Sequence, residues 1–452
     1  ALRRKVSLTE HEVAAHLRKS VDAGLPEAGS FHAGIELKRA ALEDRTLTPA
    51  GVVLIGSFST NDVRRSLETA DVFGGAELPL LRRKGFPGSL DASIVSRVAI
   101  SSAYAAAPNF EGALTWRPVE GLALFTRQHV GRRTPNIIEL FNIGQSTEHT
   151  LTDPCASGGK PLEPNVAANC ASGAPFGVPP GYDQVSYLAR YTFFGNPDLE
   201  SENVHTRVFG LAITPTDMIE VAPGKLEIAA NWLDYRIKNA ITGQNDPVKD
   251  CFTSLDLSSP ACALNPRTGN PGIVRDPSSG KVVAVEALLS NSGEFAWRGL
   301  DTELHYTLEP AGLGPIDRLW LNGVHSFAER VEHSAQAGIP IKLDGLVQFP
   351  RHRSLISAGV EAGPFDFAAF LHRRGKVITR RTQEPAAQIP AITYIDVSLR
   401  YVLDNGALVQ VGVENATNRE PPIAAFSDLA NTYPQYYDIS GRRYSVSVHM
   451  KF

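Results

Sequence analysis

Two groups of cationic side chains carry the clearest chemistry in this sequence. The first is His129, Arg132 and Arg133, and the second is His372, Arg373 and Arg374, followed by Arg380 and Arg381. Guanidinium and imidazole groups donate hydrogen bonds to carboxylates and phosphates, so either group could bind an anionic ligand. The same side chains could instead pair with lipid phosphates, or lie solvated in surface loops.

Aromatic residues form a second candidate group. They are Tyr182, Tyr187, Tyr191, Phe193 and Phe194. Their rings could stack on a sugar or aromatic ligand, pack a loop on itself, or form an aromatic girdle at a membrane surface. No nucleophile elbow, phosphate loop or metal-binding helix motif accompanies them. The sequence therefore predicts binding rather than an enzyme, with no catalytic residue, metal site or cofactor.

Four cysteines lie in two local pairs, Cys155 with Cys170 and Cys251 with Cys262. Each pair is flanked by Gly, Pro, Asn and Ser, as in a polar loop. Paired cysteines in such loops are typical of proteins in an oxidising space, such as the periplasm or the cell surface. Zinc is the alternative, but neither pair has the close spacing or neighbouring histidine of a zinc site. We therefore expect two disulfides within loops.

Composition narrows the class of protein. Of the 452 residues, 43% are hydrophobic and 20% are charged, with a formal net charge of −4. These values exclude a disordered or collagen-like chain, and they argue against nucleic acid as a partner. No run of about 20 apolar residues is present, which excludes a membrane-spanning helix. The first residues lack the apolar core of a secretion signal, so either a signal was removed or the chain begins within a longer product.

Candidate strands fill most of the chain, and about fifteen are predicted. They are 31–39, 50–58, 67–79, 92–104, 109–117, 120–129, 203–214, 224–237, 295–308, 316–327, 346–361, 365–375, 391–402, 407–415 and 441–452. Residues 1–30 instead predict a surface segment with a short helix. Thr9 with Glu12 resembles a capping box, and Val13, Leu17 and Val21 repeat at helical spacing. The prediction is therefore one all-β domain over 31–452.

Apolar and charged residues alternate along these strands. In 295–308, the residues Leu300, Leu304 and Tyr306 oppose Asp301, Glu303 and His305, and in 391–402 the residues Val397 and Leu399 oppose Asp396 and Arg400. A β-sandwich would expose its charged face to solvent, whereas a wide barrel in lipid would turn that face to its lumen. Alternation alone does not separate these two folds.

Connection lengths do separate the two folds. From residue 117 onward, short turns at 118–119, 215–223, 310–315, 363–364 and 404–406 alternate with long gaps at 130–202, 238–294, 328–345, 376–390 and 416–440. In an up-and-down meander, all the long loops then lie at one rim and all the short turns at the other. The sequence predicts a transmembrane antiparallel up-and-down β-barrel with long extracellular loops.

The last strand has a distinctive end. Tyr444, Val446 and Val448 share one face of 441–452, and the chain stops on Phe452. This resembles the C-terminal strand of bacterial outer-membrane barrels, whose terminal aromatic residue is part of the signal read by the assembly machinery. By that resemblance, Tyr444 and Phe452 would form the assembly signal, and the outer-membrane assembly machinery would be a partner.

Five motifs, in order, resemble TonB-dependent outer-membrane receptors. Segment 127–141 resembles the family's Arg-Ala-Pro step followed by Glu-Leu-Phe, with Arg-Thr-Pro in place of Arg-Ala-Pro. Segment 196–202 resembles the "NPxLxPE" motif, and segment 232–239 resembles "DYYxIxxxN". Segment 298–304 resembles "RGxDxEL", and segment 413–422 resembles the end of the penultimate strand. The two loop cysteine pairs also look like a subgroup of these receptors. The resemblance is strong from about residue 65 to the end, and the chain resembles the C-terminal part of such a barrel.

The resemblance implies a receptor in the bacterial outer membrane that takes up a scarce ligand, such as a siderophore chelate, cobalamin or a glycan. Energy would reach it from the TonB complex through a plug domain in the lumen. Nothing in the chain resembles that plug, and family barrels have about 22 strands. We therefore expect a fragment of a longer product, or a partner segment that completes the wall. Lipid or lipopolysaccharide would be further partners.

The resemblance also places the candidate residues. Ligand contacts at the long-loop rim and in the upper lumen would come from His129, Arg132, Arg133, Tyr187, Tyr191, His372, Arg373 and Arg374. The lumen wall facing the plug would carry Asp301, Glu303, His305, Asp396 and Arg400. Two other functions stay open: a passive diffusion porin, which needs no plug, and a surface barrel whose loops bind a partner protein.

Overall fold

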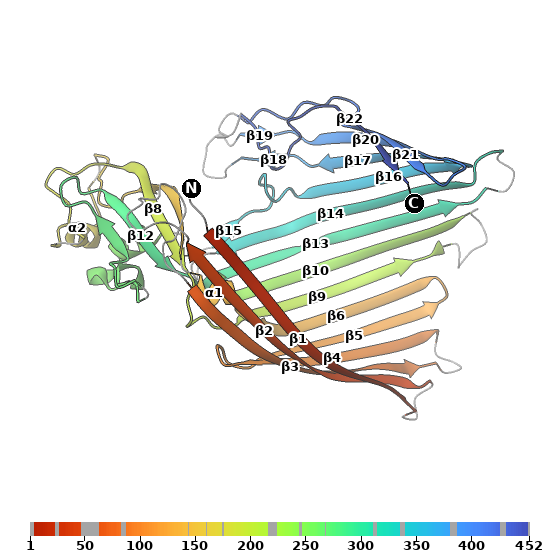
Figure 1. Cartoon of the computed structure of the whole chain (residues 1–452), viewed down its shortest axis with the longest axis horizontal. Coiled ribbons are helices and arrows are strands. Elements are labelled where there is room, and N and C mark those ends of the chain that lie inside the picture. Colours follow the sequence, from red (N-terminus) through yellow and green to blue (C-terminus); the bar gives the residue numbers. More distant parts are fainter. Residues whose placement is uncertain are drawn as a thin grey trace.

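One large antiparallel sheet forms most of the molecule in a computed structural model of the chain (Figure 1). The structure describes residues 4–450 except 23–26, 47–62, 83–86, 143, 160, 174–175, 216–223, 244–245, 267, 311–313, 335–339, 380–386 and 425–430. The strands follow one another in chain order across the sheet, so it is an up-and-down meander. This confirms the predicted fold class. Within the described residues, no pairing joins the first strand to the last.

The strands of the main sheet are β1 (Arg4–Val21), β2 (Gly29–Thr46), β3 (Val63–Leu81), β4 (Ser89–Ser101), β5 (Ala107–Val119), β6 (Leu122–Arg133), β9 (Glu202–Ile213), β10 (Lys225–Thr242), β13 (Ser290–Leu308), β14 (Arg318–Ser334), β15 (Ile341–Lys342), β16 (His352–Ala362), β17 (Phe365–Arg374), β20 (Ile392–Val402), β21 (Leu408–Glu414) and β22 (Arg443–His449). Fourteen of the fifteen predicted strands overlap these elements. The fifteenth, 50–58, lies outside the described residues, as do Arg380, Arg381 and Phe452.

The helix predicted near the N-terminus is wrong. Residues Arg4–Val21 form β1, which pairs with β2 along its whole length. Val13, Leu17 and Val21 are four residues apart, and four is an even number, so they also share one face of a strand. Ala15 lies between them on that face, and Glu12 reaches across to Lys38 at 3.7 Å. The segment therefore belongs to the main sheet rather than to a separate surface element.

The main sheet has two contrasting faces. On the apolar face, Leu300 pairs with Phe327 and Val411 pairs with Val446. Val446 is 71% exposed and Val411 is 42% exposed, although both are hydrophobic. The opposite face, here the charged face, carries acidic and basic side chains such as Asp301. A monomeric soluble protein rarely exposes so large an apolar surface, whereas a membrane barrel turns it to lipid.

The connections alternate in length as predicted. Short turns join β5 to β6, β16 to β17 and β20 to β21, and Gly363 adopts a positive φ of 53° in the second of them. The long connections 134–201 and 243–289 meet to form a separate body, here the loop domain, at one end of the sheet (Figure 1). All the short turns just named lie at the other end.

The loop domain has its own sheet and core. It contains β7 (Gln145–Thr152), β8 (Ser186–Phe194), β11 (Ile273–Arg275), β12 (Val282–Leu288), α2 (Pro164–Cys170), α4 (Pro247–Thr253), η1 (Leu255–Leu257) and η2 (Pro260–Cys262). Its strand order is β11-β12-β8-β7, so a strand of the second loop pairs with a strand of the first. The predicted disulfides, Cys155–Cys170 and Cys251–Cys262, are both formed here.

Three small elements complete the fold. Strands β18 (Val377–Ile378) and β19 (Gln388–Ile389) pair with each other beyond β17. Helix α1 (Ile137–Phe141) packs its buried Ile137 and Leu140 against Leu42 and Leu67, which lie on the charged face of β2 and β3. In the part of the chain that the structure describes, no helix has the length and apolar character needed to cross a bilayer.

Candidate ligand-binding site

Arg133, at the end of β6, anchors the first long loop. Its Nη1 and Nη2 donate to the Glu139 carboxylate at 3.0 and 2.9 Å, and its Nε donates to Glu202. Asn136 caps α1, and Glu139 completes the capping box by accepting from the Asn136 backbone N–H. Two carboxylates therefore hold Arg133 and give it a role in fixing the loop, while its contact with a ligand stays a prediction.

The other two residues of this group differ in their surroundings. His129 lies on the charged face, level with Glu111 of β5. Arg132 is exposed at the rim; alternation along β6 places it on the apolar face with Val130, opposite His129, although it also borders a hollow that Lys38 and Asp71 line. Among the described residues, no carboxylate pairs with Arg132, which leaves its guanidinium available to an anionic ligand.

This hollow, here the rim hollow, lies at the loop end of the charged face, beside α1. Of its lining residues, Arg97 contacts Asp71 at 2.8 Å, and both Arg97 and Lys38 also contact the neighbouring Glu36, at 3.1 and 3.0 Å. Apolar side chains of the α1 cluster, including Leu67, Ile137 and Tyr104, also line it. A pocket with an apolar wall and a few convergent charges is suited to a small polar ligand.

Sequence analysis missed the charged residues of the rim hollow. Lys38, Asp71 and Arg97 come from β2, β3 and β4, in the part of the chain where the motif resemblance is weak or only begins. The available signal was alternation, because each of these residues occupies the polar side of its strand. Only the register of β2 with β3 and of β3 with β4 brings them to one place.

The residues of the second cationic group lie on both faces of β17. His372 lies on the charged face, with its Nε2 3.2 Å from the Asp396 carboxylate. Arg374, on the same face, donates to the Val347 carbonyl at 2.9 Å and lies over the rings of Tyr436 and Tyr437. Arg373 points to the apolar face, where it pairs with Thr393. A single ligand in the lumen therefore cannot contact all three.

The predicted lumen residues all lie on the charged face. His305 shares a 2.9 Å contact with the Asn322 side chain, and Arg400 donates to Asp366 at 3.0 Å. Asp396 accepts from the Asn415 backbone N–H at 2.7 Å, which fixes the start of the loop after β21. Asp301 and Glu303 lie on β13, level with Ser326 and Val324 of β14. Their placement agrees with the alternation read from sequence.

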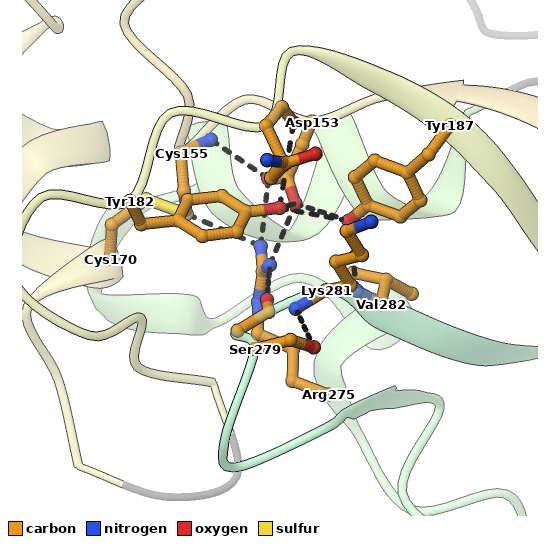
Figure 2. A network of polar contacts seen from close by, with 11 residues as sticks. Asp153, Cys155, Cys170, Tyr182, Tyr187, Arg275, Ser279, Lys281 and Val282 are labelled. Atoms are coloured by element: carbon orange, nitrogen blue, oxygen red, sulfur yellow. Dashed lines mark hydrogen bonds and ion pairs between the residues drawn. A yellow bond between two sulfur atoms is a disulfide. The ribbon is translucent and has the colours of Figure 1, made fainter.

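A buried ion pair organises the loop domain (Figure 2). Arg275 of β11 and Asp153, from the other loop, have side chains that are 1% and 0% exposed. The pair is bidentate, with Nη1 donating to Oδ2 at 2.7 Å and Nη2 to Oδ1 at 2.8 Å. The hydroxyls of Tyr182 and Tyr187 donate to the same carboxylate at 2.8 and 2.6 Å. The network ties the two loops together at their centre.

This network shows how the aromatic residues of the first long loop are packed. The Tyr187 hydroxyl is occupied by Asp153 and also accepts from the Val282 backbone N–H at 2.8 Å. Tyr191 is 6% exposed and belongs to the core of the loop domain. Both rings pack the loop domain on itself, which was one of the alternatives for this run, while Tyr187 is half-buried and its contact with a ligand stays a prediction.

The charges in the network are stable at neutral pH. Burial would raise the pKa of Asp153, but hydrogen bonds and charge from Arg275 outweigh it and hold that pKa below its usual value. Burial raises the pKa of Tyr182 and of Tyr187, so both phenols remain protonated donors. Elsewhere in the domain, burial raises the pKa of Asp246 and of Asp250.

No family model matches the chain, and no curated protein sequence matches it. Several solved structures do match the chain in fold. The ferric enterobactin receptor PfeA of Pseudomonas aeruginosa matches with a TM-score of 0.62 at 13% identity, over 98% of this chain and 54% of that one. The siderophore receptor PirA from Acinetobacter baumannii gives 0.60 at 12%, over 98% and 55%. FpvAI, in a complex with pyocin S2, gives 0.53 at 9%, over 92% and 46%.

These matches define the fold of the chain. The chain has the architecture of an outer-membrane receptor barrel, with a meandering sheet, one apolar face and long loops at one rim. More narrowly, it matches the barrel of TonB-dependent siderophore receptors without their plug domain. It spans about half the length of the matched receptors. The family resemblance drawn from the sequence motifs is confirmed at the level of the fold.

Proposed function

We propose that the chain is the barrel part of an outer-membrane receptor that takes up a scarce ligand with energy supplied through TonB. The apolar face of the main sheet carries this proposal, because exposed residues such as Val446 need a hydrocarbon environment. The fold is shared with siderophore receptors, which favours a siderophore chelate over cobalamin or a glycan. The role is binding and transport, in keeping with a receptor-barrel fold that is typically non-enzymatic.

The ligand would enter from the loop end and contact the rim hollow. Arg132, which has no carboxylate partner among the described residues, would supply a cation from the rim, on the opposite side of β6 from His129, which lies on the charged face. Asp301, Glu303, His305, Asp396 and Arg400 would face the plug across the lumen. TonB would act through that plug, and the assembly machinery would read Tyr444 with Phe452.

A protein partner at the loops is the second candidate function. FpvAI was solved in complex with pyocin S2, a protein, so its fold supports such contacts. The loop domain of this chain, with two disulfides and a buried ion pair, would offer a preorganised surface for one.

Ligand uptake tests the proposal. In cells that carry the full-length protein, uptake of a ferric siderophore should stop when the proton motive force is dissipated, whereas uptake through a porin would continue. Arg132→Gln should weaken ligand binding about tenfold, since one charge-assisted hydrogen bond is lost. Arg442→Gln, another exposed arginine outside the rim hollow, is the matched control. Uptake that survives an uncoupler would refute the transport mechanism.

A further inference from the structure

Polar residues interrupt the apolar face along a single row near the loop end. In register, His325 of β14 pairs with Ser354 of β16, Ser354 with Arg373 of β17, and Arg373 with Thr393 of β20. The next row on this face, toward the short turns, contains Gly323, Ile356, Leu371 and Ile395. On β16, β17 and β20 the apolar band therefore ends at the row of Arg373.

The height of this row fits the edge of a hydrocarbon layer. Phe365 begins β17 on the same face, and its ring lies 4.8 Å from that of Tyr401, an aromatic pair of the kind found at membrane interfaces. Arg373 follows eight residues later, or about 26 Å along a strand at roughly 3.3 Å per residue. With the tilt usual for barrel strands this is about 20 Å along the barrel axis, close to the height of the apolar band in such barrels.

Four side chains with donor groups gather at this edge. His325, His352, Arg373 and Lys376 line one hollow on the apolar face. The two imidazole rings stack at 5.5 Å, and His325 Nδ1 contacts the Ser354 hydroxyl at 2.8 Å. The ring of Phe327 lies 5.0 Å from that of His352 and holds it in place. Across the described residues, neither Arg373 nor Lys376 forms an ion pair with a carboxylate.

A second charged group on the apolar face has its cations paired with a carboxylate of the same chain. On β10 and β13, the Asp234 carboxylate contacts Arg236 at 3.1 Å and Arg298 at 3.0 Å. Asp234 lies one row beyond Trp232, and Arg298 stacks over the Trp232 ring. There the protein supplies its own counter-ion. Among the described residues, the hollow at Arg373 contains no such carboxylate, so its positive charge is available to an anion from outside the chain.

We propose that the hollow formed by His325, His352, Arg373 and Lys376 binds a phosphate group on the headgroup of an outer-leaflet lipid. The inference rests on the proposed function, because it needs the apolar face to lie in a bilayer. Lipid phosphates occupy this height and attract Lys and Arg. Exposed Ile356 lies directly below the hollow, where the acyl chains of the same lipid would pack, which favours a lipid over a free phosphate.

Lipid retention tests this site. The full-length protein is purified into nanodiscs of phosphatidylcholine that contain either diphosphoryl lipid A or its dephosphorylated form, and bound lipid is measured by native mass spectrometry. The wild type should retain the phosphorylated lipid at least tenfold better. Arg373→Gln with Lys376→Gln should remove that preference. Arg236→Gln, which takes one cation from the neutralised group on the same face, should leave it unchanged.

Each other outcome is decisive. Equal retention of both lipids, or loss of the preference in Arg236→Gln as well, overturns the site. Displacement of the lipid by an excess of inorganic phosphate would assign the hollow to a free anion and overturn the lipid assignment. Fractionation of the cells that express each variant separates failure of this inference from failure of the proposed function. A protein found outside the membrane contradicts both, whereas an inserted protein without the lipid preference contradicts this inference alone.

Discussion

Three adjacent residues of β17 show how the direction of a side chain decides what it can bind. His372 and Arg374 turn to the charged face, and Arg373 turns to the apolar face. The sequence already held this information, because a predicted strand over 365–375 places neighbours on opposite faces. Their proximity in the chain suggested a single binding group, although the three side chains do not share a face. The role of Arg133 was harder to foresee, since its carboxylate partner Glu202 lies 69 residues away.

Acid should loosen the loop domain through Asp153. Its pKa in the folded protein is lowered, so the ion pair adds stability above the ordinary aspartate pKa of about 3.9 and loses it as pH falls through the lower folded value. The raised pKa values of Asp246 and Asp250 act in the opposite sense, because protonation relieves their burial. Hydrogen exchange in β8 and β12, corrected for intrinsic rates, should therefore rise below about pH 4.

Asp153→Asn should remove most of this pH dependence by destabilising the loop domain at neutral pH. It leaves Arg275 buried without a counter-charge, which costs about 3 to 5 kcal/mol in comparable pairs. Asp198→Asn, an exposed carboxylate of the same loop, is the control and should exchange like the wild type. Wild-type protection in Asp153→Asn would show that the ion pair does not hold the domain together.

The loop domain marks the limit of prediction at the scale of elements. Alternation and turn residues predicted most strands of the main sheet, though not β1, because each pairs with the next strand of the meander. The small sheet instead pairs β12 with β8 in parallel, so that Val285 lies opposite Tyr191. These strands come from two different loops, and no local pattern indicates that they meet. The disulfides were predictable because each closes within its own loop.

The attachment of α1 offers a test at this scale. Glu202 has a side chain only 4% exposed; it holds Arg133 and accepts from the Ile241 backbone N–H at 2.6 Å. Glu202→Ala leaves that buried N–H without a partner, at a cost of about 1 to 3 kcal/mol. Limited proteolysis should then cut 134–141 faster. Glu200→Ala, an exposed glutamate two residues away, should behave like the wild type, and equal rates for both variants would contradict the anchoring role.

At the scale of the whole molecule, two patterns in the sequence sufficed for the fold. Alternation gave a sheet with one apolar and one charged face, and the regular sequence of short and long connections placed the loops at one end. Neither depends on which residues bind a ligand. The rim hollow therefore remained hidden while the barrel around it was predicted, because register across three strands, rather than any motif, brings Lys38, Asp71 and Arg97 together.

The environment of the apolar face can be tested with a single exposed residue. Val446 is 71% exposed, so in water Val446→Lys would change the free energy of unfolding by no more than about 0.5 kcal/mol. In a bilayer, a lysine on the lipid-facing side of a barrel costs more, from about 1 kcal/mol near the interfaces to about 2 to 4 kcal/mol at the midplane. Ser445→Lys places the same charge one residue away on the charged face and should cost little. Urea titrations of both variants folded into liposomes measure the difference, and equal midpoints would place the apolar face outside lipid and remove the basis for a transport role.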